Sequence, residues 1–261
     1  MTTTPERAGT VIGPPALSVE GRGFPARHLI TPVVLALILL ALFLYIGGRE
    51  LDSIEQRSIN SEVIAARGIE HVRLTAVSTA AVILLAVPTG IILTRAGASQ
   101  ATPVVLALAN IGQATPSIGI LVLFAIVWKI GFQAAVVALV AYSFLPILRN
   151  TMVGLEGVDR SLIEAGRGMG MSKMKVLFSI ELPLAVPVIL AGIRTALVIN
   201  VGTAALAWAV NAGGLGDIIY TGITTRRDPT LITGAVLTSV LALFIDWLGG
   251  MVEDVLRPKG L

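Results

Sequence analysis

Six long apolar segments, separated by short polar stretches, dominate the hydrophobic pattern of this 261-residue chain. Each is about 17 to 27 residues long, which suits a helix that crosses a bilayer core of about 30 Å. The predicted spans are residues 29–48, 72–93, 102–128, 132–148, 184–210 and 231–249. We therefore predict an all-α membrane protein with about six transmembrane helices.

The segments outside these spans are polar. Residues 1–28 are rich in Pro and Gly and predict a flexible tail, while residues 250–261 form a charged tail. No small-residue cleavage site follows the first apolar run, so we interpret that run as a span rather than a signal peptide. Residues 49–71 carry charges of both signs and predict a solvated connection that can hold a short surface helix. Residues 29–249 are expected to form one transmembrane domain.

The third span differs from the others because polar residues stand at its centre. Pro116 removes one backbone hydrogen bond, and neighbouring polar side chains can satisfy the groups that it frees. The polar cluster comprises Asn110, Gln113, Thr115, Pro116 and Ser117. Two interpretations remain open: a broken or kinked helix that lines a cavity, or a kink that is simply packed.

A glycine-punctuated polar stretch, residues 159–183, predicts two short helices joined by a hinge. Asp159 or Ser161 can cap the first helix, and Ser172 can cap the second. Three glycines are expected to break the first helix, and the last of them is free to take a positive φ. These glycines are Gly166, Gly168 and Gly170. The apolar residues expected on the two helices are Leu162, Ala165, Met169, Met174, Leu177 and Phe178. Two short helices that project with exposed apolar residues form a surface that a soluble partner could bind.

Two other roles for this stretch are helix capping by Glu164 and phosphate binding by the glycine run. Ser161-x-x-Glu164 also fits a capping box, in which Glu164 closes its own helix without excluding a docking role. The glycine run does not fit a phosphate-binding loop, because it lacks the G-x-x-x-x-G-K-[ST] spacing and no strand precedes it. Nucleotide binding by this stretch is therefore disfavoured.

Arg194 lies inside the predicted fifth span, where a charge is costly unless it has a partner. Asp246 in the sixth span sits at a comparable depth, so we predict that the two are neighbours. A structural ion pair and a gate that opens and closes both fit this pair. Asn200, also in the fifth span, is grouped with them as a candidate residue of the path.

The composition supports a membrane protein and excludes several kinds of chemistry. Charged residues make up 13% of the chain, whereas a soluble domain carries roughly 25%. The chain has no Cys, which excludes disulfides, thiolate catalysis and iron–sulfur clusters. Its two His do not stand at ligand spacing with carboxylates, so no metal is expected. No basic stripe with interleaved aromatic residues indicates nucleic-acid binding.

Lys and Arg are distributed unequally between the two sides of the predicted topology. With the N-terminus inside, the inner segments hold 11 of the 19 basic residues and the outer segments hold 7. The remaining basic residue, Arg194, lies inside a predicted span. This bias predicts that both termini and the 159–183 stretch face the cytoplasm.

Gly214-Leu215-Gly216-Asp217 matches the G-x-G-D motif of intramembrane aspartyl proteases. Such an enzyme needs two carboxylates that share a proton at membrane depth. Asp246 is the other acid near a span, but the predicted topology places it near the inner face and Asp217 on the outer side. We expect the two acids to lie far apart, so the protease is disfavoured and no enzymatic activity is expected.

The 159–183 stretch resembles the EAA loop of bacterial ABC import permeases. Glu164-Ala165, Gly170, Ile180 and Leu182-Pro183 match the family spacing. Gly166 replaces the family's Ala, which adds flexibility without removing a contact group. In that family the loop docks into the cytoplasmic ATPase subunit as a coupling helix. The resemblance implies an ATPase-contacting surface formed by Glu164, Ala165, Gly166, Arg167, Gly170, Met171 and Lys173.

Further stretches extend the resemblance over about residues 111–222, to the permeases of osmoprotectant importers. These stretches are residues 112–117, 145–151, 181–187, 191–195 and 213–217. That group carries glycine betaine, choline, carnitine or related compatible solutes, and the resemblance implies the type I ABC importer transmembrane fold. The Gly-Gly-Leu-Gly-Asp stretch is shared with methionine permeases, which keeps an amino-acid solute open.

The resemblance also implies partners and a location in the bacterial cytoplasmic membrane. A second permease subunit, identical or paralogous, would complete the pathway, and two ATPases would use ATP and Mg²⁺. No fused binding domain follows residue 249, so a separate extracytoplasmic binding protein is expected to deliver the solute. This chain itself would bind no cofactor. A secondary transporter is the alternative class, but inverted repeats and acids inside the spans would be expected there, and only Asp246 qualifies.

Overall fold

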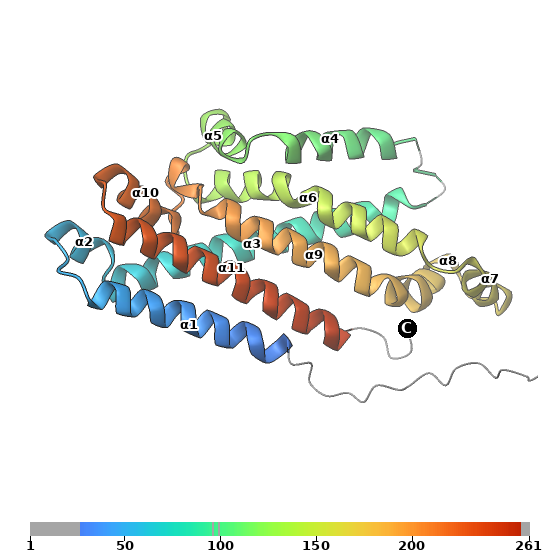
Figure 1. The fold of residues 1–261 in the computed structure, drawn as a ribbon. Helices are drawn as coiled ribbons and strands as arrows, with labels where there is room; N and C mark the ends of the chain where they lie inside the picture. The colour runs from blue at the N-terminus through green and yellow to red at the C-terminus, as the bar shows by residue number, and fades with distance from the viewer. Residues whose placement is uncertain (1–26, 96, 99, 257–261) are drawn as a thin grey trace, which may run out of the picture.

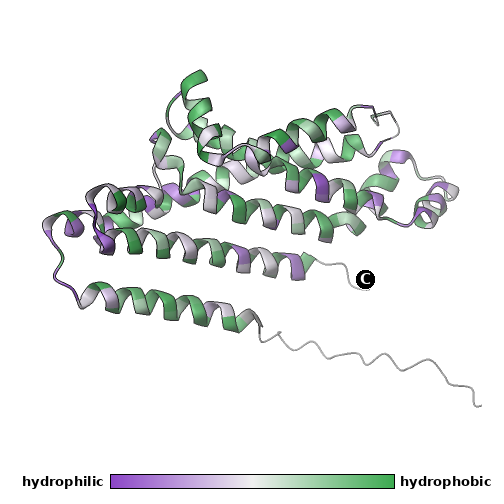
Figure 2. Ribbon diagram, turned by 45° about the horizontal axis from the view of Figure 1, so that its top comes forward, coloured by the Kyte–Doolittle hydropathy of each residue, from purple (hydrophilic) through white to green (hydrophobic). Residues whose placement is uncertain are grey.

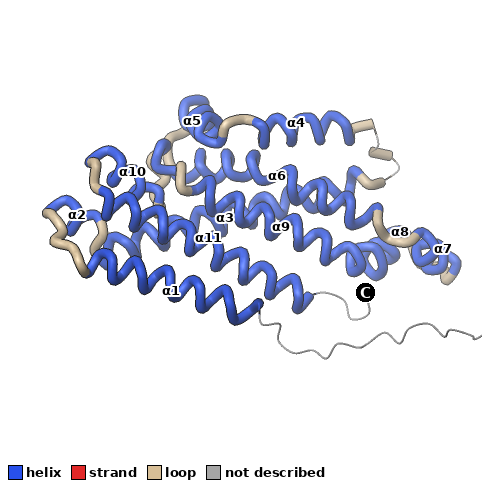
Figure 3. Tube along the Cα trace, viewed as in Figure 1, coloured by secondary structure: helices blue, strands red, loops and turns tan. Residues whose placement is uncertain are grey.

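The computed structural model describes residues 27–95, 97–98 and 100–256, so the predicted tail 1–28 falls almost wholly outside the described residues. Over the described residues Figure 3 shows helices joined by loops and no strand. The elements follow the order α1 (Arg27–Gly47), α2 (Ser53–Ser58), α3 (Ser61–Leu93), α4 (Thr102–Ala114), α5 (Ser117–Val127), α6 (Phe132–Glu156), α7 (Arg160–Gly168), α8 (Lys173–Val176), the π-helical turn η1 (Leu177–Glu181), α9 (Leu182–Ala204), the 3-10 turn η2 (Ala207–Val210), α10 (Gly216–Thr225) and α11 (Asp228–Leu256).

Five helical segments are long and apolar enough to cross a membrane, and the bent pair of α4 and α5 provides a sixth. The long helices lie side by side in one bundle, with α7 and α8 at one end and α2 and α10 at the other (Figure 1). The start of α1 and the end of α11 lie at the same end as α7 and α8. Hydrophobic residues run along the long helices, and hydrophilic ones gather mainly at the two ends (Figure 2).

Small residues bring the three central helices, α3, α6 and α9, close together. An added Cβ on Gly90 of α3 would lie 2.7 Å from the Thr151 side chain of α6. An added Cβ on Gly192 of α9 would lie 2.5 Å from the Asn150 Cβ of α6. Lipid tails are as apolar as the helices, so close packing of this kind drives association within the membrane. Leu139 of α6 is completely buried in the resulting core.

Several helices begin or end at other residues than the hydrophobic pattern predicted. The helix of the second span begins at Ser61, before the predicted residue 72, because Asn60 Oδ1 accepts a hydrogen bond from Val63 N–H and caps a longer helix. The predicted short helix in the preceding connection is confirmed as α2. The fourth span continues to Glu156, the fifth helix ends at Ala204, and α11 extends into residues 250–256 of the predicted tail. Residues 257–261 lie outside the described part of the chain.

Candidate functional site

The predicted coupling loop folds as two short helices, α7 and α8, which project from the end of the bundle (Figure 1). Asp159 caps α7, because its Oδ1 accepts a hydrogen bond of 2.8 Å from the backbone N–H of Ser161. The same hydrogen bond lowers the pKa of the Asp159 carboxyl. Ser161 lies inside α7, so it is not the cap and the predicted capping box with Glu164 does not form.

The hinge between the two helices is at Gly170. Its φ of 81° lies in the left-handed region, which other residues adopt only with strain. Gly166 lies within α7 and does not break it, contrary to the prediction, because glycine weakens a helix without forbidding it. Gly168 is the last residue of α7, so the helix does end beside it. Ser172 Oγ accepts a hydrogen bond of 3.3 Å from Lys175 N–H, which confirms the predicted cap of α8.

Gly166 is buried where α7 packs against the root of the next span. An added Cβ there would lie 2.7 Å from Ile180 Cδ1 and 3.3 Å from Met171 Sδ. Both atoms end flexible side chains, so a methyl group would displace them rather than the backbone. Gly166 therefore serves close packing inside a helix, not the added flexibility that the sequence suggested.

The surface of the loop combines exposed apolar side chains with charged ones. Met169 is 76% exposed, and Met174 and Phe178 are each 61% exposed. Leu177 was predicted to belong with them but is 6% exposed, because it packs into the core beneath α8. The surrounding exposed residues of the predicted surface are Glu164, Ala165, Arg167 and Lys173. Apolar patches rimmed by polar residues are typical of protein–protein contacts.

A cleft of about 470 Å³ lies behind the loop. The charged residues in its walls are Arg95, Glu156, Arg160, Arg167, Lys173 and Glu181. Arg95 Nη2 lies 2.7 Å from Glu181 Oε2, and the Glu181 side chain is only 8% exposed. Arg95 follows the end of α3, and Glu181 closes the π-helical turn before Pro183. The ion pair therefore joins the root of the loop to the neighbouring span, a contact that no spacing in the sequence indicated.

The predicted break in the third span is confirmed. α4 and α5 meet at a bend of 102°, with Thr115 and Pro116 between them. The Thr115 hydroxyl donates a 2.7 Å hydrogen bond to the Ile111 carbonyl, which also accepts a 3.1 Å bond from Thr115 N–H. Gln113 and Ser117 are partly buried at the two sides of the bend. The break thus gathers polar groups at one corner of an otherwise apolar span.

The predicted contact between Arg194 and Asp246 is also confirmed. Arg194 Nε donates to Asp246 Oδ1 at 2.6 Å, and Nη2 donates to Oδ2 at 2.7 Å. Glu253 Oε2 lies 3.6 Å from Arg194 Nη1. An added Cβ on Gly249 or Gly250 would lie 3.1 Å from the Arg194 side chain. The two glycines therefore leave room for the guanidinium to lie across α11 between two carboxylates.

Asn200 has a different environment from the other candidate residues of the path. It is completely buried, and its Nδ2 donates a 3.0 Å hydrogen bond to Thr79 Oγ1 of α3. Its Oδ1 has no hydrogen-bond partner. The structure places Asn200 in the packing between α3 and α9.

The Gly-Gly-Leu-Gly-Asp stretch lies at the end of the bundle opposite the loop, where it binds the start of α3. Gly214 N–H donates to Glu70 Oε2 at 3.0 Å, and Leu215 N–H donates to His71 Nδ1 at 3.3 Å. His71 Nε2 lies 3.0 Å from the Val201 carbonyl. Since Nδ1 accepts a hydrogen bond, Nε2 carries the proton and the ring is neutral in this arrangement. His71 thus ties α3 to α9 and to this stretch, a role that the sequence did not indicate.

Asp217 forms an ion pair with Arg67 at 2.9 Å instead of sharing a proton with a second carboxylate. Burial raises the pKa of the Asp217 carboxyl. Asp246 lies 18 residues after the start of α11, about 27 Å along the helix. The two acids are therefore not a protease dyad. Within the described ranges, no three His, Asp or Glu side chains are grouped as metal ligands would be.

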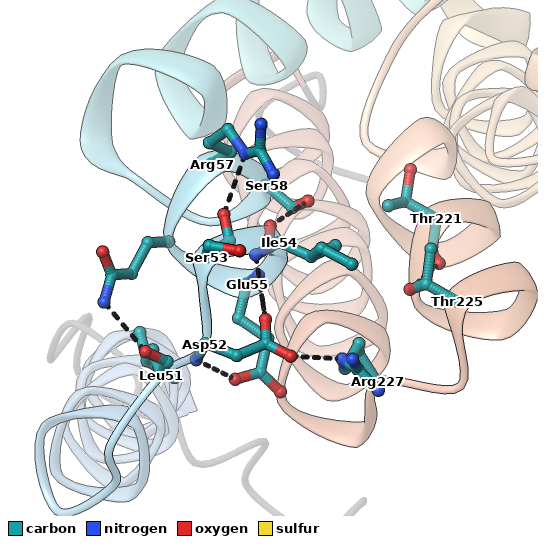
Figure 4. Close-up of polar contacts among 11 residues, drawn as sticks. Leu51, Asp52, Ser53, Ile54, Glu55, Arg57, Ser58, Thr221, Thr225 and Arg227 are labelled. Carbon is teal, nitrogen blue, oxygen red and sulfur yellow. Dashed lines mark hydrogen bonds and ion pairs between the residues drawn. The ribbon is translucent and has the colours of Figure 1, made fainter.

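The same end of the bundle is fastened by Asp52, which caps α2 (Figure 4). Its Oδ1 accepts hydrogen bonds of 2.9 Å from the N–H groups of Ile54 and Glu55. Its Oδ2 lies 2.6 Å from Arg227 Nε, in the connection between α10 and α11. The bond from Glu55 and the Arg227 charge lower the pKa of the Asp52 carboxyl. This contact holds α2 against the start of the last span.

The fold thus combines a bundle of long apolar helices, one broken span and a projecting pair of short helices. The chain belongs to the family described as the binding-protein-dependent transport system inner membrane component, whose family model matches residues 86–258. That match begins within α3 and includes the broken span and the projecting loop. The chain is thus a multi-pass membrane component of a transport system.

Relatives and solved structures agree with this assignment. The choline transport system permease protein OpuBB of Bacillus subtilis is 41% identical over 74% of this chain and 88% of its own length. The osmoprotectant import permease protein OsmY of Salmonella typhimurium is 41% identical over 81% of this chain and 88% of its own. Among solved structures, an inward-facing MetNI methionine ABC transporter matches with a TM-score of 0.69 and 27% identity, over 77% of this chain and all of that one. The fold is that of an ABC importer transmembrane domain.

Proposed function

We propose that this chain is the permease subunit of an ATP-driven importer for a compatible solute such as glycine betaine, choline or another quaternary amine. Support comes from relatives named for choline and osmoprotectant transport, which are about 41% identical to this chain. An amino-acid solute is the second candidate, favoured by the fold shared with a methionine transporter, but the identity there is only 27%.

The observation that carries the proposal is the projecting pair α7 and α8, with its exposed apolar and charged surface. Residues Lys173–Ala204 form one continuous helical segment of 32 residues, so a displacement of α8 is passed directly into a span. ATP binding by two partner ATPases, with Mg²⁺, would move the docked loop and switch the spans as rigid bodies. The proposed contact surface is Glu164, Ala165, Arg167, Gly170, Met171 and Lys173, while the buried Gly166 supports it from behind by letting α7 pack closely.

The remaining parts of the importer follow from this arrangement. Both described chain ends lie on the side of α7 and α8, which supports cytoplasmic termini. A second permease subunit would complete the path, and Salmonella typhimurium has two different permease proteins, OsmY and OsmW, that are 41% and 39% identical to this chain. A paralogous partner is therefore as compatible as an identical one. A separate binding protein would dock at the opposite end, beside α2 and α10.

Within this importer the broken third span is proposed to line the path. Its polar corner comprises Gln113, Thr115, Pro116 and Ser117. Arg194 and Asp246 are proposed to border the path on the inner side and to hold α9 and α11 together. Asn200 is proposed to fix α3 against α9 beside the path.

The test is reconstitution of the chain with its ATPase and binding protein, followed by measurement of solute uptake and ATP hydrolysis. Glu164→Ala and Glu164→Gln are both expected to reduce ATPase association, because Glu164 is exposed on α7 and forms no capping box with Ser161. Glu62→Ala, an exposed acid at the opposite end, is the matched control for ATPase association and should retain the ATPase like the parent. Parent-like uptake by both Glu164 variants would contradict the proposed docking surface.

A further inference from the structure

Arg149 occupies an unexpected place for a charged residue. The sequence placed it at the end of the fourth span, but α6 continues for seven residues to Glu156, about 10 Å further along the axis. Its side chain is exposed on the surface of α6 and not buried among the helices. Arg149 therefore stands on a helical surface and not in a loop, with its charge exposed beside α4.

One neighbouring side chain orients Arg149. Its Nη2 donates a 3.3 Å hydrogen bond to Asn110 Oδ1 of α4. Asn110 Nδ2 in turn donates to the Leu106 carbonyl at 2.7 Å, which directs the amide oxygen towards the guanidinium. An added Cβ on Gly112 would lie 2.8 Å from the Ala141 carbonyl, so α4 and α6 are in close contact there. That close contact lies about 12 Å along α6 from Arg149, so the hydrogen bond to Asn110 is what links the guanidinium to α4.

The charge of Arg149 is not matched by a carboxylate within residues 27–95, 97–98 and 100–256. Arg67, Arg95 and Arg194 each form ion pairs with acids, whereas none of these ion pairs includes Arg149. A guanidinium has five N–H donors in a planar fork that fits a carboxylate through two parallel bonds. Arg149 thus offers free donors on an exposed face.

Arg149 also lies beside the proposed path. Asn110 is three residues before Gln113 on α4, so these two side chains share one face of the helix. Gln113 belongs to the polar corner where the third span breaks. The polar surface of the break therefore continues through Asn110 to the Arg149 guanidinium on α6.

We propose that Arg149, oriented by Asn110, binds the carboxylate of the transported solute on its way through the membrane. This inference rests on the proposed function and narrows its solute class to quaternary amines that also carry a carboxylate. The guanidinium is suited to this task because it stays charged and binds carboxylates in a fixed geometry. A carboxylate from a second permease subunit is the competing partner, and the experiment separates the two.

Glycine betaine and choline provide the matched comparison, because both carry a trimethylammonium group. Glycine betaine has a carboxylate where choline has a hydroxymethyl group. In the reconstituted complex, Arg149→Gln should reduce glycine betaine uptake roughly ten- to a hundredfold, as the loss of a charged hydrogen-bonded contact implies. Choline uptake, where the parent carries choline, should change much less. Equal losses for both solutes, as a subunit contact would cause, or no loss for either would overturn the inference.

A second variant keeps the test decisive if the complex carries only one of the solutes. Arg149→Cys introduces the one thiol of this cysteine-free chain, and partner proteins without reactive cysteines complete the complex. Aminoethyl methanethiosulfonate restores a positive charge and should restore glycine betaine uptake, whereas the neutral methyl reagent should not. Glycine betaine should slow the reaction.

If the charged and the neutral reagent have the same effect on glycine betaine uptake, the inference is overturned while the proposed function stays intact. A parent complex that moves no solute at all would overturn both.

Discussion

Arg194 of α9 and Asp246 of α11 face one another through two parallel hydrogen bonds of 2.6 and 2.7 Å. Their side chains are 36% and 39% exposed, so the pair lies at the edge of the helix packing. It joins the helix that continues from the projecting loop to the last helix of the bundle. A movement of α9 would therefore carry α11 with it unless the pair breaks.

Removal of one partner from this pair should destabilise the protein. Asp246→Asn removes the carboxylate charge and one acceptor oxygen, so the longer contact to Glu253 becomes the remaining ion pair of Arg194. The change should cost about 1.5–3 kcal/mol, nearer the lower value because both groups are partly exposed. Replacing both Arg194 and Asp246 by Leu should be less harmful than either single replacement, since no lone charge remains in the membrane. The measurement is thermal unfolding of the purified chain in detergent.

Glu253→Gln is the control for this cycle, because its contact with Arg194 is 3.6 Å long. It should shift the unfolding midpoint less than Asp246→Asn. The single variants of the cycle are Arg194→Leu and Asp246→Leu. If their losses in unfolding free energy add up to the loss in the double variant, the pair is not energetically coupled.

The ion pair between Arg95 and Glu181 is predicted to transmit the movement of the projecting loop to α3. Glu181 is 8% exposed, so Arg95→Gln leaves a nearly buried carboxylate without its partner. We expect ATP hydrolysis to continue in the assembled complex while the amount of solute moved per ATP falls severalfold. The exchange of the two residues, Arg95→Glu with Glu181→Arg, should recover part of that ratio.

Measurement of uptake and ATP hydrolysis on the same proteoliposomes gives this ratio directly. An unchanged ratio in Arg95→Gln would show that the pair is only structural.

Local signals in the sequence were enough to predict the spans, the break and one long-range pair. Pro116 has no N–H to donate, but Pro88 and Pro146 lack it too and lie inside the continuous helices α3 and α6. The additional local signal at the break was the cluster of polar residues beside Pro116. Arg194 and Asp246 were predictable because lone charges at similar depth in a membrane each need a partner. The spans themselves were predictable because an apolar run long enough to cross the bilayer is evident from composition alone.

Other features depend on three-dimensional contacts that no local pattern records. Residues 61–71 are helical but polar, and hydropathy does not detect a helix that continues beyond the membrane. Arg95 and Glu181 are 86 residues apart, and Glu181 becomes buried only once α3 and α9 have packed. Asn200 looked like a path residue in an apolar span, whereas its contact with Thr79 shows that it lies inside the packing.

The corner of the broken span is predicted to be reachable by water in at least one transport state. Ser117→Cys should react with a small aqueous thiol reagent, because Ser117 is only partly buried beside the bend. Ser143→Cys is the matched control, since Ser143 is completely buried in α6 and should stay unreactive in the folded protein. Labelling is measured with and without ATP. Complete protection of Ser117→Cys under both conditions would favour a packed kink over a path.

The turn at Gly170 is predicted to set the angle at which α7 and α8 meet the ATPase. Its φ is 81° and an added Cβ would meet no atom within 4 Å, so any substitution acts through the backbone alone. Gly170→Ala should cost about 1–2 kcal/mol in the local structure, and the β-branched Gly170→Val should cost more. Gly168 is the matched control, because it has the same open surroundings but helical backbone angles.

Gly168→Ala should therefore leave ATPase association unchanged or slightly stronger, by up to about 1 kcal/mol of helix stability. Gly170→Val should weaken association while membrane insertion stays normal, because the turn lies beyond the end of the bundle (Figure 1). Co-purification of the ATPase with each variant measures the first quantity, and the yield of folded chain in the membrane measures the second. If Gly170→Val retains the ATPase and transports like the parent, then the angle between α7 and α8 does not control coupling. The docking surface would then have to tolerate a rearranged loop, although Gly166 within α7 is buried against Ile180 and Met171 and leaves α7 little freedom to move.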